Sequence, residues 1–70
     1  MDAQQVLADN IKHIMCEKGL KQKYVAARAG FEENTFSNML NRRKLIRAEH
    51  LPIIAEALEV PVNALFERNA

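Results

Sequence analysis

The sequence contains few of the residues that crosslink or interrupt a small protein. Its 70 residues include one cysteine, two glycines, two prolines and no tryptophan. The single cysteine, Cys16, excludes an internal disulfide and any metal site made of several cysteines. Because glycine and proline are rare while 49% of the residues are hydrophobic, the composition is typical of a folded protein rather than a disordered one.

Long apolar runs and catalytic motifs are also missing. No stretch approaches the roughly 20 apolar residues of a membrane span, and the first residues, with Asp2 and Asp9, lack a signal-peptide pattern, so we expect a cytoplasmic protein. His13 and His50 have no cysteine or carboxylate motif at metal-ligand spacing, and no nucleophile–base motif or phosphate-binding glycine loop is present. These absences, in a chain too short for a deep cleft, predict a binding protein without enzymatic activity, metal, cofactor or small-molecule substrate.

The net charge of +1 hides an uneven distribution of charged residues. Residues 12–47 carry nine basic and three acidic side chains, which gives +6, whereas residues 1–11 carry −2 and residues 48–70 carry −3. A basic centre between acidic ends is compatible with a polyanionic partner that binds to the centre. An ordinary solvated surface can have the same pattern, so charge alone leaves both interpretations open.

Apolar residues recur at helical spacing along the chain, and no run alternates with the period of a strand. The spacing predicts one all-α domain over residues 1–70, with helices at about 3–18, 22–29, 33–41, 49–58 and 61–67. Gly19 and Gly30 follow the first two helices and are suited to a left-handed turn. Pro52 is expected in the first turn of the fourth helix, and Pro61 is expected to open the fifth.

Two short helices joined by a turn around Gly30 form the most informative pattern. Gly30 can take a positive φ, so the chain can turn sharply there, and Phe31 can fill the gap below the turn. The second helix of such a pair projects outward at an angle that fits the major groove of DNA. Many small helical bundles also contain this unit, so a purely structural role stays open at this point.

From Leu7 to Phe66 the chain resembles the lambda-repressor-like, or Cro-like (XRE-type), helix-turn-helix family. The matching motifs are Gly19-Leu20, Gln22 with Val25-Ala26, Ala29-Gly30-Phe31, Thr35-Phe36, Ile54-Ala55, Ala57-Leu58, Val60-Pro61-Val62 and Leu65-Phe66. The resemblance implies a compact five-helix domain whose second and third helices form the DNA-reading unit. It further implies a sequence-specific transcriptional regulator, a small repressor of phage or bacterial type, that binds double-stranded DNA and can act as a homodimer on two half-sites.

The resemblance also implies which residues contact DNA. Gln22 matches a glutamine that grips a phosphate, the exposed face of the third helix is expected to read bases, and the basic loop after it is expected to contact the backbone. The candidate DNA-binding residues are Gln22, Lys23, Glu33, Asn34, Thr35, Ser37, Asn38, Arg42, Arg43 and Lys44. Arg28 is a weaker phosphate candidate. A solvated surface is the alternative for the asparagines and for the basic loop.

A second candidate surface is apolar and lies near the C-terminus. Val62, Leu65 and Phe66 are candidate dimer-interface residues, and packing against the first helix is the alternative.

The sequence departs from the family pattern inside the helical core and at two helix starts. Many relatives pair an arginine late in the first helix with a glutamate near the end of the third, whereas this chain has Met15 and Leu40, which we expect to touch. A hydrophobic pair of this kind can replace a buried ion pair without loss of stability. Lys21 and Glu32 stand where relatives carry a serine or threonine cap, and both are poor caps.

Two further departures concern the predicted reading helix. Arg42 stands where relatives carry a glycine, so Asn41 is expected to take the left-handed turn. Glu32 and Glu33 place negative charge at the start of the helix, which suits a helix N-terminus but repels phosphates. These glutamates motivate an alternative function: a protein–protein interaction module, antitoxin-like or the partner of a regulator, that keeps the fold and binds DNA weakly or not at all.

Overall fold

Helix α1 (Ala3–Lys18) has a suitable capping residue at each end. The computed structural model, which describes residues 2–67, places Asp2 at the N-cap, where its side chain accepts a hydrogen bond of 2.7 Å from the Gln5 N–H. Gly19 at the C-cap is left-handed, with φ 68°, and its N–H donates back to the last turn. The helix spans the predicted range because local signals mark both of its ends.

Helices α2 (Gln22–Ala29) and α3 (Glu33–Leu40) follow, and α3 is one residue shorter than predicted. Gly30 links them in the left-handed conformation, with φ 82°. The residues before the two helices, Lys21 and Glu32, make no side-chain capping bond. The starts of these helices therefore depend on packing rather than on a cap.

The C-terminal third differs in detail from the predicted fourth and fifth helices. The expected fourth helix begins as a 3-10 helix, η1 (Ala48–His50), and continues as α4 (Leu51–Leu58) with a proline in its first turn. The expected fifth helix is a 3-10 helix, η2 (Val62–Phe66). Residues 2–67 therefore contain four α-helices and two 3-10 helices, and the predicted count of five helices is not confirmed.

The length of η2 explains its geometry. A segment of five residues has few chances to form the i to i+4 bonds of an α-helix, and short pieces commonly close i to i+3 bonds instead. The Ala64 N–H donates such a bond, of 3.0 Å, to the Pro61 carbonyl. The apolar spacing of this segment reports which residue faces the core, and it does not distinguish the two kinds of helix.

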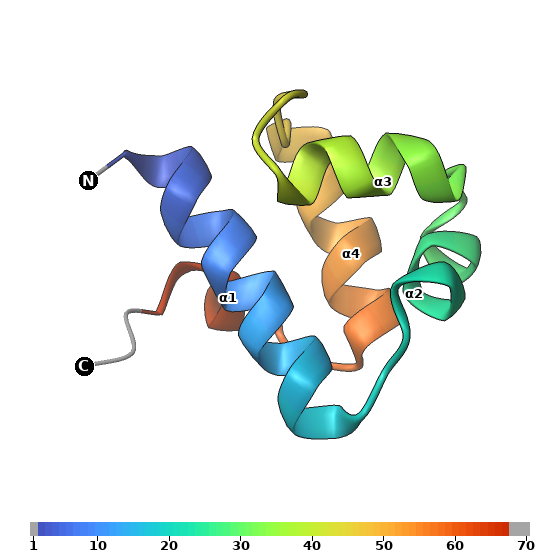
Figure 1. The fold of residues 1–70 in the computed structure, drawn as a ribbon. Helices are drawn as coiled ribbons and strands as arrows, with labels where there is room; N and C mark the ends of the chain where they lie inside the picture. Colours follow the sequence, from blue (N-terminus) through green and yellow to red (C-terminus); the bar gives the residue numbers. More distant parts are fainter. Residues whose placement is uncertain (1, 68–70) are drawn as a thin grey trace.

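The helices of residues 2–67 pack around one hydrophobic core, to which η1 contributes no buried side chain. Helix α1 packs against α3 and η2, α2 packs against α3 and α4, and Figure 1 shows α4 in the middle with α1, α2 and α3 around it. The largest fully buried side chains are Ile11, Val25, Phe36, Met39, Ile54, Leu58 and Leu65. None of the helices within residues 2–67 has the length and apolar character needed to cross a membrane. The predicted domain also includes Met1 and residues 68–70, which lie outside the described residues.

The predicted apolar pair between α1 and α3 lies in this core. Met15 and Leu40 are 8% and 3% exposed, they belong to one cluster of buried residues, and the two helices are in contact. Neither side chain is charged, so the core holds no buried ion pair at these positions. Direct contact between the two side chains stays a prediction.

An aromatic cluster closes the turn between α2 and α3. The rings of Phe31 and Phe36 are stacked, with centroids 6.1 Å apart and an interplanar angle of 7°. His50 of η1 meets Phe31 edge-on, with centroids 5.2 Å apart. Phe31 is half-buried and Phe36 is fully buried, so the turn is joined to the core by apolar contact.

Candidate functional site

The predicted binding residues come from α2, α3 and the loop of residues 41–47 after α3, which is called the basic loop below. Helix α3 runs along the upper edge of the molecule in Figure 1, with α2 beside its start and the basic loop at its end. The exposed members of the set are Lys23, Glu33, Asn34, Arg42, Arg43 and Lys44, and the half-buried ones are Gln22, Thr35, Ser37 and Asn38. None of the ten is buried, because the apolar residues Phe36, Met39 and Leu40 take the inner face of α3.

Ser37 and Asn41 form a small hydrogen-bond network at the end of α3. The Asn41 Nδ2 donates to the Ser37 carbonyl at 2.9 Å and to the Ser37 Oγ at 3.4 Å. Since a donor already points at the Oγ, the Ser37 hydroxyl is best placed to donate its own hydrogen to an outside acceptor. A phosphate oxygen or the acceptor atoms of a base edge fit that requirement.

The chain leaves α3 through a left-handed residue, and this residue is Arg42, with φ 61°. Asn41 has φ −95° and ψ 9°, so the prediction of a left-handed Asn41 is wrong. The physical reason is that Asn41 still belongs to the hydrogen bonding of the helix, since its N–H donates to the Ser37 carbonyl at 3.0 Å. The reversal therefore falls on the next residue, at a cost of about 1–2 kcal/mol for a side chain other than glycine.

The basic loop is held at both of its ends. At the start, the Asn38 carbonyl accepts the N–H of Arg43 at 2.8 Å and of Lys44 at 3.2 Å. At the far end, Ile46 is buried, with 3% exposure, and the side chain of Gln4 in α1 bonds to its backbone. Sequence reasoning missed Gln4 and Ile46. The one available signal was the apolar pair Leu45-Ile46 within a run of basic residues, and it does not show which of the two is buried.

The two ends of α3 carry opposite charge. Glu32 and Glu33 lie at its start, and both are exposed. Arg42, Arg43 and Lys44 follow its end and are exposed as well. The eight residues of the helix place these groups about 12 Å apart along the axis. A bound polyanion is therefore attracted at one end of α3 and repelled at the other.

Arg28, the weaker phosphate candidate, is engaged within the chain. Its Nη1 donates to the Tyr24 hydroxyl at 3.1 Å and to the Glu59 Oε2 at 3.0 Å, and its guanidinium lies 5.7 Å from the centre of the Tyr24 ring. The hydrogen bond to Tyr24, followed by that to Glu59, raises the pKa of Arg28. The contact with Glu59 spans 31 residues of sequence and joins α2 to the end of α4, so sequence reasoning did not find it.

The three predicted dimer residues lie on η2 and differ in their exposure to solvent. Leu65 is fully buried, so its assignment to a dimer surface is corrected: η2 packs on α1 and α4, and Leu65 fills that contact. Val62 and Phe66 are 39% and 49% exposed, and they stay candidates for an interface.

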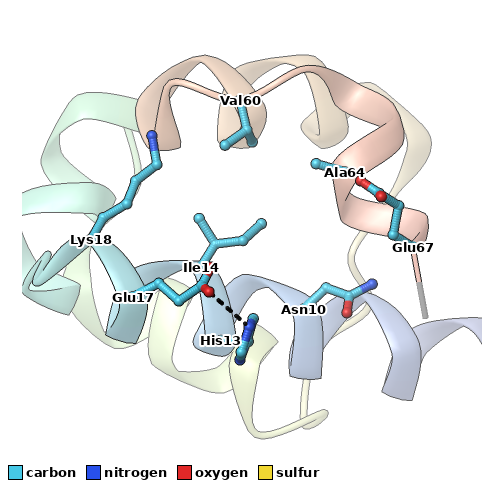
Figure 2. Close-up of a pocket in the computed structure, with 8 residues that line it drawn as sticks. All are labelled: Asn10, His13, Ile14, Glu17, Lys18, Val60, Ala64 and Glu67. Carbon is cyan, nitrogen blue, oxygen red and sulfur yellow. Dashed lines mark ion pairs between the residues drawn. The ribbon is translucent and has the colours of Figure 1, made fainter. Parts of the chain in front are cut away.

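A shallow hollow of about 260 Å³ lies between α1 and the segment from the end of α4 to η2 (Figure 2). Residues that line it include Ile14, Val60 and Ala64, and His13 and Glu17 face each other at its rim, 3.4 Å apart. None of the ten predicted binding residues lines it. The hollow is therefore separate from the surface that these ten residues form on α2, α3 and the basic loop, which is called the α3 surface below. Within residues 2–67 no group of three or more histidine, cysteine or acidic side chains could hold a metal ion.

Comparisons with known proteins agree with this geometry. The family model of Cro/C1-type helix-turn-helix DNA-binding domains matches residues 10–70. The fold is similar to the crystal structure of the clp gene regulator ClgR from C. glutamicum, with a TM-score of 0.86 and 18% sequence identity over 93% of this chain and 84% of that chain. No curated protein sequence matches the chain. At 18% identity the structural likeness shows the fold alone.

Proposed function

The chain belongs to the family of Cro/C1-type helix-turn-helix DNA-binding domains, and we propose that it is a sequence-specific transcriptional regulator, a small repressor of phage or bacterial type. The observation that carries the proposal is the α3 surface. None of the ten predicted contact residues is buried there, and the basic loop follows the end of the helix. A DNA target also places the proposed activity in the cytoplasm.

In the proposed complex α3 enters the major groove. An α-helix with its side chains is about 10–12 Å across, which matches the width of that groove, about 12 Å. Asn34 and Asn38 are proposed to pair with adenine, Glu33 to accept from cytosine, and Thr35 and Ser37 to contact phosphate or base edges. Gln22 and Lys23 at the start of α2, and the cations of the basic loop, are proposed to hold the phosphate backbone. The phosphate contacts position the domain, and the α3 contacts select the sequence.

The exposed Glu32 and Glu33 favour a second candidate function. A surface that carries two carboxylates beside its polar helix can bind a basic partner protein instead of DNA. In that case the domain is a protein–protein interaction module that keeps the fold and binds DNA weakly or not at all.

Titration of a randomised pool of fluorescent duplexes at 50 and 200 mM salt distinguishes the two functions. Contact with about six phosphates predicts a loss of roughly a thousandfold in affinity between these salt concentrations. Arg42→Ala/Arg43→Ala should flatten the salt dependence, whereas Asn34→Ala/Asn38→Ala should reduce the preference among sequences. Lys18→Ala, which removes a cation at the hollow of Figure 2, is the control and should change neither. Absence of binding at 50 mM salt would favour the protein-recognition module.

The proposed regulator binds as a homodimer through Val62 and Phe66, on half-sites about one helical turn apart. Both side chains are apolar and substantially exposed on η2. Sedimentation velocity of the free protein and of its complex with a selected duplex tests this. We expect two chains per duplex, reduced to one by Phe66→Glu. One chain per duplex for the native protein would exclude the dimer.

A further inference from the structure

Gln4 and Ile46 form a two-point contact across 42 residues of sequence. The Ile46 N–H donates to the Gln4 Oε1 at 2.7 Å, and the Gln4 Nε2 donates to the Ile46 carbonyl at 3.0 Å. One side-chain amide thus satisfies both backbone groups of one residue. Gln4 lies in the first turn of α1, and Ile46 lies near the end of the basic loop.

The burial of Ile46 makes this contact important. Ile46 is 3% exposed, so water has little access to its backbone, and a shielded N–H or C=O group needs a partner inside the protein. In regular structure a neighbouring turn or strand would supply that partner, but residues 42–47 belong to neither a helix nor a strand. Gln4 supplies both hydrogen bonds. Without its amide, Ile46 can recover them only by moving toward water.

The contact ties the end of the basic loop to α1. The start of the loop is fixed to α3 through the Asn38 carbonyl, and its end is fixed to α1 through Gln4. Helix α1 is itself anchored in the core by Leu7 and Ala8, which are 3% and 1% exposed. In Figure 1 the first turn of α1 and the loop lie on the same upper side of the molecule. Arg43 and Lys44 are therefore held directly at the first anchor, and the second anchor, at Ile46, lies two residues beyond Lys44.

We propose that Gln4 is a positioning residue for DNA binding: it holds the end of the basic loop so that Arg42, Arg43 and Lys44 meet the phosphates while α3 occupies the groove. This inference rests on the proposed DNA-binding function. The proposal distinguishes two properties of the interface, which are the strength of its phosphate contacts and its preference among sequences. Loss of the Gln4 amide should weaken the phosphate contacts of the loop, whereas the sequence preference of α3 should stay, because buried Phe36 and Met39 fix that helix.

Gln4→Met tests the proposal, because methionine is similar in length and cannot form either bond. Gln5→Met is the matched control: it makes the same change one residue further along α1, at another half-buried position. For Gln4→Met we expect affinity for a selected duplex about tenfold weaker at 50 mM salt and a salt slope smaller by about one, with the ranking of sequences unchanged. The Ile46 amide should also exchange with solvent faster in the free protein, relative to the amides of α1. Gln5→Met should leave all four properties as in the native chain.

A double-mutant cycle distinguishes positioning from general destabilisation. When Arg42→Ala/Arg43→Ala/Lys44→Ala has removed three of the four cations of the loop, Gln4→Met should weaken binding by no more than about twofold. A tenfold loss in that background would overturn the proposal, as would unchanged affinity and salt slope for Gln4→Met in a native chain that binds DNA. Unchanged exchange of the Ile46 amide together with weaker binding would show that Gln4 contacts DNA directly, and would also overturn it. If the native chain binds no duplex, the DNA-binding function fails first, and the role of Gln4 falls with it.

Discussion

The turns that enter and leave α3 both reverse the chain through a left-handed residue, but different forces stabilise them. Gly30 takes this conformation in the entry turn, with φ 82°, and Phe31 closes the turn by stacking on Phe36. Glycine adopts a positive φ without the steric penalty of a side chain. The entry turn is thus unstrained, apolar and complete within a few residues of sequence.

The exit turn has the opposite character. Arg42 takes the left-handed conformation with φ 61°, and the loop that follows is held by hydrogen bonds to the Asn38 carbonyl and to the Gln4 side chain. A glycine would fit the backbone better, but it would remove one of the cations at the end of α3. The comparison shows a glycine in the turn that is closed by apolar contact, and a strained residue in the turn whose charge lies on the proposed DNA surface. Strain is not confined to that surface, because Glu59 at the end of α4 is also left-handed, with φ 60°.

The largest effect should come from the apolar support of the entry turn. Phe36 is fully buried, so Phe36→Ala should lower the free energy of unfolding by about 3–5 kcal/mol, from lost apolar contact and the cavity left behind. Urea denaturation followed by circular dichroism measures this. Phe66→Ala removes the same ring from a position that is 49% exposed, and should cost less than about 1 kcal/mol. Equal losses for the two variants would show that the ring below the turn is not what stabilises it.

Substitution of the left-handed residue should change the free energy of unfolding by less than Phe36→Ala does, and in opposite directions at the two turns. Gly30→Ala should lower it, and Arg42→Gly should raise it. A Cβ added at Gly30 meets no atom within 4 Å, so Gly30→Ala creates no clash and its cost is conformational alone. We expect a loss of about 1 kcal/mol in the free energy of unfolding. Ala27→Ser, at an exposed position of α2, controls for substitution near the turn and should cost less. No loss at Gly30 would mean that this turn tolerates any small residue and that its glycine is not required.

The complementary change at the exit turn should stabilise the protein. Arg42→Gly relieves the positive φ, whereas Arg42→Ala removes the same charge and keeps the strain. The free energy of unfolding, measured by thermal denaturation, should therefore be about 1 kcal/mol higher for the glycine variant than for the alanine variant. Both variants should lose DNA affinity to the same extent, since both lose one cation. A glycine variant that binds DNA much worse than the alanine variant would show that the backbone at residue 42, and not only the charge, serves binding.

Local signals account for what could be predicted from the sequence. The ends of α1, the Gly30 turn and the apolar faces of α1 to α4 follow from caps, glycines and spacing, which act within a few residues. A left-handed Asn41 is expected because Arg42 replaces the glycine of the family, but helical hydrogen bonding extends through Asn41. The 3-10 geometry of η2 was missed because apolar spacing reports burial and not the hydrogen-bond pattern.

Long-range polar contacts could not be predicted from the sequence. The Gln4–Ile46 and Arg28–Glu59 contacts span 42 and 31 residues, and they depend on where whole helices come to rest. Nothing in the local surroundings of Gln4 distinguishes it from Gln5. The residues of the α3 surface could be named from a family resemblance, but the contacts that hold the loop in place could not.

The smallest effect concerns the acidic end of α3. Glu33 is exposed in the first turn of the helix, and Glu33→Gln should raise the affinity for unselected duplexes about threefold at 50 mM salt, because it removes repulsion from phosphates. The gain should shrink at 200 mM salt, where exposed charges are more strongly screened. Glu17→Gln makes the same change of charge at the hollow of Figure 2 and should have little effect on binding. If Glu33 also accepts from a cytosine, the gain should be smaller for the preferred duplex than for the pool. A loss of affinity for every duplex would contradict the repulsion and would place the carboxylate among the groups that attract DNA to α3.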